Sequence, residues 1–259
     1  MRPLRAVYEY LVLYYGLALL GLICLSWTVI ATLLHPLLPR RWGGALGRRA
    51  IMVAFRFYLA AISITGTCRF DLSALDALKS QGPMIIAPNH PSLLDAVMVL
   101  SRLPDVVCVM KAALLENIFL GGGARLARYL HNDALIRLIG KATASLREGS
   151  QLLIFPEGTR TTRAPVNAFK GAVAGIAKRA VVPVQAVFIE TDSPFLGKGW
   201  PLFRKPAMPM HYRIRLGRRF DPPADAQAFQ RELQRYFDEE LGGAPARAAA
   251  SDQAKRAAG

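Results

Sequence analysis

The stretch MIIAPNHPSLLDAVMVL, residues 84–100, combines two patterns that together decide the fold. Residues 84–87 form a short apolar run of the kind that becomes a fully buried strand. Residues 93–103 are mostly apolar and end before a proline, which predicts a helix. His90 and Asp95 lie where the strand would pass into the helix, and Ser92 can cap that helix. There, Asp95 could hold one imidazole nitrogen of His90 and leave the other free to accept a proton.

A second motif, Phe155-Pro-Glu-Gly-Thr-Arg160, follows another apolar run over residues 152–155. Gly158 lets the backbone approach a ligand closely, and Arg160 offers a planar fork of donors that suits phosphate. Thr159 adds a hydroxyl donor. Glu157 either binds a ligand hydroxyl or orders the loop. Taken alone, each motif also has a purely structural interpretation: a surface turn here, and a packed histidine beside a helix-capping aspartate at residues 90–95.

Strands alternate with helices along most of the chain, which predicts an α/β domain with a largely parallel sheet flanked by helices. Both motifs follow strands, and ligands in such sheets collect beyond the carboxyl ends of strands, so we expect one shared cleft. The domain would cover residues 66–241, and the Gly-, Ala- and Pro-rich residues 242–259 would form a disordered tail. We expect strands at 66–71, 84–87, 106–110, 152–155, 181–189 and 212–216, and helices at 72–78, 93–103, 136–147, 171–179 and 225–241.

The N-terminal residues 1–65 predict a membrane-embedded helical anchor. No residue from 10 to 34 is charged, and this run of about 25 residues is long enough to cross a hydrocarbon core of ~30 Å. More arginines follow it than precede it, which favours a cytoplasmic location for the C-terminal side. Residues 50–64 would add a second helix, interfacial or re-entrant. Whether the anchor spans the bilayer or is monotopic stays open, and a buried core helix is the minority alternative.

Composition limits the classes of partner and chemistry. The 259 residues carry a formal net charge of +15, which favours anionic lipid headgroups, an acidic carrier protein or a phosphorylated substrate. Nucleic acid is a weaker candidate, because no zinc-finger spacing or RNA-binding signature is present. The three cysteines and four histidines are scattered, so we expect neither a disulfide scaffold nor a metal site. No G-x-S-x-G elbow occurs, so a serine nucleophile of that type is not expected.

The two motifs resemble the first and third signatures of the glycerolipid acyltransferase family, typified by 1-acylglycerol-3-phosphate acyltransferase. The resemblance runs from about the first helix to about residue 216. It implies that His90 is the general base and Asp95 its partner. It further implies that the acceptor is bound by the loop residues Glu157, Gly158, Thr159 and Arg160. The family's second block begins with a lysine at a strand end, which Lys111 matches, and we expect this lysine to contact phosphate.

The rest of the second block departs from the family. The run Gly121-Gly-Gly-Ala-Arg125 is unusually glycine-rich, and His131 falls near the place of the expected arginine. Arg125 or Arg128 could substitute from a different angle. The fourth block, residues 182–185, matches only weakly. The departure leaves the identity of the acceptor open.

The resemblance implies a membrane-bound O-acyltransferase that needs no cofactor and uses acyl-CoA or acyl carrier protein as donor. The free hydroxyl of a lysophospholipid would be the acceptor, with 1-acyl-sn-glycerol-3-phosphate giving phosphatidic acid as the first choice. We expect the bacterial inner membrane, with the catalytic domain on its cytoplasmic face. The alternatives are another lyso-acceptor, such as a lyso-aminolipid or a specialised lipid intermediate, and a non-catalytic membrane lipid-binding protein.

Overall fold

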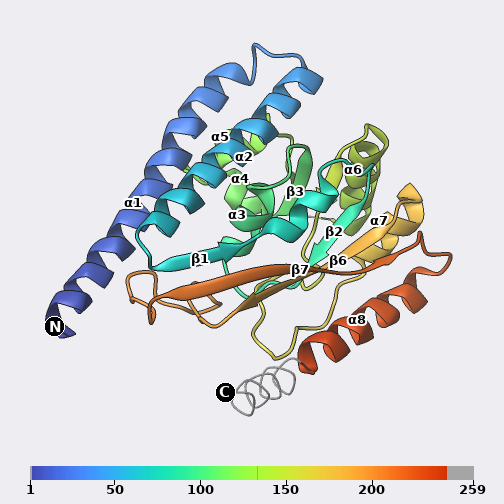
Figure 1. Cartoon of the computed structure of the whole chain (residues 1–259). Coiled ribbons are helices and arrows are strands. Elements are labelled where there is room, and N and C mark those ends of the chain that lie inside the picture. Colours follow the sequence, from blue (N-terminus) through green and yellow to red (C-terminus); the bar gives the residue numbers. More distant parts are fainter. Residues whose placement is uncertain (1, 133, 244–259) are drawn as a thin grey trace.

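The computed structural model describes residues 2–132 and 134–243, and a sheet in the order β1-β7-β6-β2-β5-β3-β4 organises them (Figure 1). Strands β2 to β6 run parallel to one another, which confirms the largely parallel sheet. Strand β7 is antiparallel to β6, and β1 follows β7 in direction, so one edge is reversed. The strands are β1 (Cys68–Asp71), β2 (Ile85–Pro88), β3 (Val106–Met110), β4 (Leu130–His131), β5 (Gln151–Leu153), β6 (Val184–Thr191) and β7 (Met210–Phe220).

The predicted helices are present, with two additions and one change of type. The helices are α1 (Arg2–Leu34), α2 (Arg40–Ile64), α3 (Leu94–Leu100), α4 (Ala112–Leu115), α5 (Gly121–Leu126), α6 (Leu135–Arg147), α7 (Ala172–Ala180) and α8 (Ala226–Gly242). Residues 73–78 form a 3₁₀ helix, η1 (Ser73–Leu78), rather than an α-helix. Helices α4 and α5 and strand β4 were not predicted, because such short segments show too little periodicity. Of the predicted tail, residues 242 and 243 end α8, and the rest lies outside the described residues.

Two apolar cores lie on opposite faces of the sheet. Along the β2 segment, Met84 and Ile86 face one core, and Ile85 and Ala87 face the other, and all four are fully buried. The first core packs against α3 and the α1–α2 hairpin, and the second packs against α6, α7 and α8 (Figure 1). A strand that is buried on both faces has no polar side, which explains the continuous apolar run in the sequence.

Helix α1 lies along the domain beside α2 (Figure 1). In the described part of the chain it is the one helix that is long and apolar enough to cross a membrane, judged by length and composition. Both ends of α1 are bonded to the domain. Near its start, Arg5 donates to the carbonyl of Met208 at 2.8 Å, and near its end, Thr28 donates to the carbonyl of Phe119 at 2.7 Å.

Helix α2 begins at Arg40, ten residues before the start that the apolar run predicted, so that predicted boundary was wrong. Its first half is rich in glycine, and this obscured the helix in the sequence. The glycines let it lie directly on the backbone after α5: a Cβ on Gly47 would come within 2.7 Å of the Ala127 nitrogen. Arg48 also faces the domain, where its Nε pairs with Asp105 at 2.5 Å.

Candidate active site

The carboxyl ends of β2, β5 and β3 bring the predicted residues to one edge of the sheet. Strand β5 lies between the other two, paired with both of them. The loop after β2 carries His90, the loop after β5 carries residues 155–160, and Lys111 directly follows β3. The two loops are also joined by a hydrogen bond of 2.7 Å from the Thr161 N–H to the His90 carbonyl. The expectation of one shared cleft is thus confirmed.

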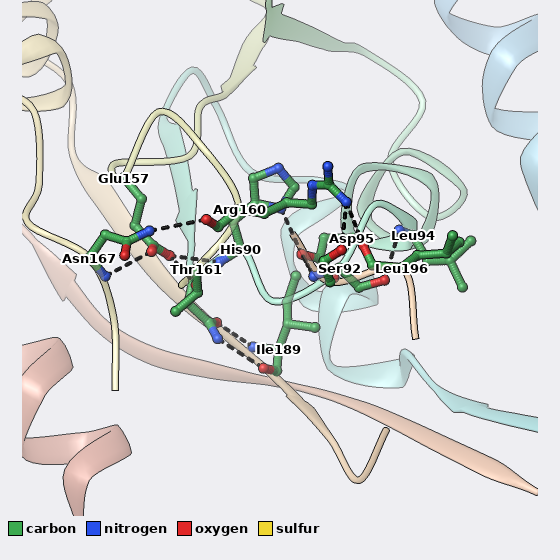
Figure 2. Close-up of polar contacts among 12 residues, drawn as sticks. His90, Ser92, Leu94, Asp95, Glu157, Arg160, Thr161, Asn167, Ile189 and Leu196 are labelled. Atoms are coloured by element: carbon green, nitrogen blue, oxygen red, sulfur yellow. Dashed lines mark hydrogen bonds and ion pairs between the residues drawn. The ribbon is translucent and has the colours of Figure 1, made fainter. Parts of the chain in front are cut away.

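His90 and Asp95 form a hydrogen-bonded pair (Figure 2). His90 Nδ1 lies 2.7 Å from Asp95 Oδ2, which also accepts the Ser92 N–H at 2.8 Å. An ionised carboxylate can only accept, so Nδ1 carries the proton and Nε2 is left as an acceptor. The N-cap of α3 is Leu93, without a side-chain cap, so the predicted cap at Ser92 was one residue too early. The Ser92 hydroxyl oxygen accepts the Leu94 N–H at 3.2 Å.

Asp95 is fully buried, and this burial changes the pKa of its carboxyl group. Burial raises the pKa of Asp95 to about 6, against the opposing effect of the hydrogen bond with His90. Its Oδ1 is buried without a hydrogen-bond partner among the described residues, so part of the lost hydration is not replaced.

The ring and the backbone of His90 are both held in place. The imidazole stacks on Phe155, with ring centroids 3.9 Å apart and planes 20° apart. The preceding residue, Asn89, makes a two-bond link to strand β6. Its Nδ2 donates to the Ile189 carbonyl at 2.9 Å, and its Oδ1 accepts the Ile189 N–H at 2.7 Å (Figure 2). No role was predicted for Asn89, because its partner is a hundred residues away in the chain.

Glu157 ties the two motif loops together (Figure 2). Its side chain is buried, and Oε1 accepts the His90 N–H at 2.9 Å and the Thr161 hydroxyl at 2.8 Å. The other oxygen, Oε2, accepts the Asn167 N–H at 2.8 Å. Glu157 does not line the cavity described below. Of its two predicted roles, the geometry therefore favours ordering of the loop.

Arg160 lies in the cavity wall and is fixed there by backbone carbonyls. Its Nη1 donates to the carbonyls of Leu196 and Gly197 at 2.9 and 2.8 Å. Two bonds through one nitrogen hold the guanidinium plane in a set orientation. Since a guanidinium has five N–H donors, this anchoring leaves donors for a ligand.

Two lysines join Arg160 in lining the same cavity. Lys111 was predicted, whereas Lys170, immediately before α7, was missed because no motif marks it. Gly158 has φ +65°, and a Cβ there would come within 2.9 Å of the Lys170 Cδ. The Lys170 side chain thus lies across Gly158. Thr159 lines the cavity as well, so three cations, a hydroxyl and His90 line one cavity.

The cavity has a volume of about 700 Å³, within the usual range for a ligand site. Around the motif loops it is lined by His90 and the three cations. Elsewhere its walls are mostly apolar and come from several helices; the α1–α2 hairpin contributes Leu20, Ile23, Cys24, Trp27, Ile51 and Phe55. A ligand with an anionic head and a long apolar chain matches this division.

Cys108 also lines the cavity but does not compete as a nucleophile. Burial raises the pKa of its thiol to about 12, so the reactive thiolate is scarce at neutral pH. Within residues 2–132 and 134–243, no three His, Cys, Asp or Glu side chains gather as metal ligands would.

The glycine-rich run has a packing role. It forms α5, which lies directly against α1. A Cβ on Gly122 would come within 2.4 Å of the Thr28 carbonyl oxygen, and one on Gly123 within 2.7 Å of Trp27 Cδ1. Such close contact of two helices needs residues without side chains.

The three residues considered for the place of the second block's arginine lie outside the cavity. Of the described residues, neither Arg125, Arg128 nor His131 lines the cavity. Arg125 Nη1 donates to the Leu115 carbonyl at 2.6 Å, and Arg128 Nη1 lies 3.2 Å from His35 Nε2. None of these three side chains therefore takes the arginine's place in the cavity, although their neighbours Ala124, Tyr129 and Asn132 do line it.

Comparisons with known proteins agree with the geometry. The model of the family described as Acyltransferase matches residues 69–190. A 1-acyl-sn-glycerol-3-phosphate acyltransferase of Pseudomonas aeruginosa is 25% identical over 180 residues, covering 67% of this chain and 68% of that protein. The human 1-acyl-sn-glycerol-3-phosphate acyltransferase beta is 28% identical over 134 residues, covering 49% of this chain. The match spans about half of the human protein, 48% of its length.

A solved structure shares the fold. The crystal structure of the 1-acyl-sn-glycerophosphate (LPA) acyltransferase PlsC from Thermotoga maritima matches with a TM-score of 0.67 and 18% identity. The match covers 95% of this chain and 98% of that one, so the hairpin is part of the shared fold. Both sequence motifs fall within residues 69–190, so the region that resembles the Acyltransferase family contains the residues that line the cavity around His90.

Proposed function

We propose that this protein transfers a fatty acyl chain from a thioester to the free hydroxyl of a lysophospholipid. The proposed acceptor is 1-acyl-sn-glycerol-3-phosphate, and the product is phosphatidic acid. One observation carries the proposal: His90, hydrogen-bonded to the buried Asp95, lines a cavity that is also lined by three cations and many apolar side chains. The names of the human and Pseudomonas relatives support this choice of acceptor.

The proposed reaction needs one base and no covalent enzyme intermediate. Asp95 holds the Nδ1 proton of His90, so Nε2 accepts the proton of the acceptor hydroxyl. The hydroxyl oxygen attacks the thioester carbonyl, the C–O bond forms and the C–S bond breaks. The departing thiolate then takes the proton from the imidazolium. Proton removal by a positioned base typically contributes ~10²–10⁴ in rate.

The three cations form the proposed site for the acceptor's phosphate. Arg160 presents its remaining N–H donors from a guanidinium held by two carbonyls, and Lys111 and Lys170 add ammonium groups. Hydrogen bonds to charged partners are roughly twice as strong as neutral ones, so a phosphomonoester fits this arrangement better than an uncharged alcohol. Thr159 can add a hydroxyl bond.

The acyl chains would occupy the apolar part of the cavity, between the domain and the hairpin. Coenzyme A and acyl carrier protein are both anionic, and the net charge of +15 favours either donor. A thioester that enters beside His90 would place its chain against α1 and α2, whose side chains line that part of the cavity.

We further propose that the hairpin lies in one face of the membrane instead of crossing it. Both ends of α1 are bonded to the same domain, so a spanning α1 would pull the domain into the hydrocarbon. An in-plane hairpin needs an exposed apolar face. Its large exposed apolar side chains include Leu11, Tyr14, Leu22, Leu25, Val29, Leu33, Val53 and Phe57. In a bacterium, the cytoplasmic face of the inner membrane would be the place where soluble donors reach it.

A second candidate is the acylation of another lyso-acceptor, such as a lyso-aminolipid. It is favoured by one observation: the described arginines near the family's second block lie outside the cavity. The two candidate functions predict different orders of kcat/KM among lyso-acceptors.

The test is thiol release from palmitoyl-CoA by the purified full-length protein, measured with lysophosphatidic acid, lysophosphatidylethanolamine and monoacylglycerol. We expect lysophosphatidic acid to give the highest kcat/KM and monoacylglycerol the lowest. Equal or better turnover of lysophosphatidylethanolamine would favour the second candidate. Lipid binding without thiol release from any acceptor would contradict both and leave a lipid-binding protein.

A further inference from the structure

A cluster of basic side chains lies at the turn between α1 and α2, outside the proposed active site. We call His35, Arg40 and Arg128 the turn cluster. Arg128 reaches it from the segment after α5, where its backbone has φ +61°, a conformation that is uncommon for a residue with a side chain. Its Nη1 lies 3.2 Å from His35 Nε2, and its Cγ would be 3.2 Å from a Cβ on Gly44 of α2. None of the three lines the catalytic cavity.

The positive charge of the turn cluster is not balanced. Burial and, to a smaller extent, repulsion by Arg40 lower the pKa of Arg128 from its usual value. Its Nε is buried without a hydrogen-bond partner among the described residues. The sequence has no aspartate or glutamate between Glu9 and Asp71, so neither hairpin helix supplies a carboxylate beside the cluster. The neighbouring Arg48 is paired with Asp105.

The N-terminus of α2 adds to this positive potential. The helix begins at Arg40, has no acidic residue in its first turn, and no side chain caps it. Its first N–H groups and the positive end of its dipole therefore lie at Arg40, within the turn cluster. Capping by an acidic side chain is the usual solution, and its absence here leaves room for an anion from outside the chain.

The surroundings of the turn cluster identify the source of that anion. Leu33, Leu37, Trp42 and Leu46 flank the turn and are 66%, 74%, 65% and 44% exposed. Tryptophan and arginine beside exposed leucines are typical of the boundary between headgroups and acyl chains. A soluble anion needs only the cations, whereas a phospholipid matches the cations and the leucines together.

We propose that the turn cluster binds the phosphate of an anionic bilayer phospholipid, separately from substrate. Arg40, Arg128 and the free N–H groups of the first turn of α2 donate to the phosphate oxygens, and the lipid chains lie against the exposed leucines. This contact fixes the end of the hairpin at headgroup level, so that the level of the cavity relative to the bilayer is set by a lipid that is not consumed.

The test uses the purified full-length protein in maltoside micelles and isothermal titration with dioctanoyl phosphatidylglycerol. Dioctanoyl phosphatidylcholine, coenzyme A and inorganic phosphate serve as comparison ligands. The test variant is Arg40→Gln/Arg128→Asn, in which asparagine tolerates the left-handed backbone. The matched control, Arg69→Gln, removes an exposed charge from β1. Arg40→Gln alone, at an exposed position, keeps the test valid if the double variant does not fold.

We expect the wild type to prefer phosphatidylglycerol to each comparison ligand. The double variant should lose about tenfold or more of that affinity, and Arg40→Gln alone about fourfold, because each cation near a headgroup contributes substantially. Arg69→Gln should stay within about twofold. The proposal is overturned if both test variants bind phosphatidylglycerol like the wild type. It is also overturned if phosphatidylcholine, coenzyme A or inorganic phosphate binds as tightly as phosphatidylglycerol.

Discussion

Replacing Glu157 with glutamine separates the loop-ordering role of this carboxylate from a role in binding the acceptor. Its two oxygens accept from His90, Thr161 and Asn167. Glutamine has the same size, but one end of its amide donates. Whichever way the amide turns, a buried backbone N–H then faces an NH₂ group instead of an acceptor, either at His90 or at Asn167.

The size of the effect follows from those contacts. A hydrogen bond to a charged group contributes ~1.5–3 kcal/mol, and a buried donor without a partner costs about 1–3 kcal/mol. These two losses overlap, so we expect Glu157→Gln to lower the free energy of unfolding by ~2–4 kcal/mol. If the displaced His90 loop raises the activation free energy by half of that amount, kcat falls about 5–30-fold, since 1.4 kcal/mol is tenfold in rate.

The assay is thiol release at saturating palmitoyl-CoA with varied lysophosphatidic acid, alongside denaturant unfolding. Glu157 does not line the cavity, so the acceptor KM should stay within about threefold while kcat falls. Glu148→Gln, the same change at an exposed site, should shift stability by less than about 0.5 kcal/mol. A tenfold rise in acceptor KM with unchanged kcat would refute the reasoning and place the carboxylate on the acceptor.

Three further predictions use the same assays. Lys170→Ala should raise the KM for lysophosphatidic acid about tenfold and leave that for monoacylglycerol unchanged, because only the first has a phosphate; equal rises would remove the phosphate role. In the wild type, Asp95 gains a proton as pH falls through about 6, so kcat/KM should fall there. Asp95→Asn should be slow at every pH, because the amide can hold the imidazole in the wrong tautomer, and turnover at the wild-type rate would contradict the orienting role of Asp95. The same raised pKa means that ionised Asp95 is less stable in the folded state, so wild-type stability should fall between about pH 4 and 6 as pH rises, and that of Asp95→Asn should not. Gly122→Ala should lower stability by ~1–3 kcal/mol, since its Cβ meets a backbone oxygen, whereas Gly140→Ala, with open space around it, should be neutral or stabilising in the same melts.

The His90–Asp95 pair could be predicted from the sequence because its geometry is local. His90 and Asp95 are only five residues apart, between a buried strand and a helix, so the short loop brings their side chains together. Parallel strands then bring their loops to one edge of the sheet. The contacts that fix the pair are long-range. Two examples are the link from Asn89 to Ile189 and the position of Lys170 over Gly158. Both depend on the folded chain, and no local sequence pattern predicts them.

In the fold, too, features with a local sequence pattern were predicted and features that depend on long-range packing were missed. The central strands were predicted because burial on both faces gives continuous apolar runs. The reversed edge was not, because β7 alternates apolar residues with arginines, and only five of its residues stood out. The early start of α2 was missed because glycines at the contact with α5 lower the helical and apolar signal where the packing is closest.

The central claim is that His90 is the base for acyl transfer, and the turnover of His90→Ala tests it most directly. The measurement is the rate of coenzyme A release from palmitoyl-CoA and lysophosphatidic acid by the purified variant. Removal of a positioned base should lower this rate by at least about 10²-fold. Turnover at the wild-type rate would contradict the assignment of His90 as the base.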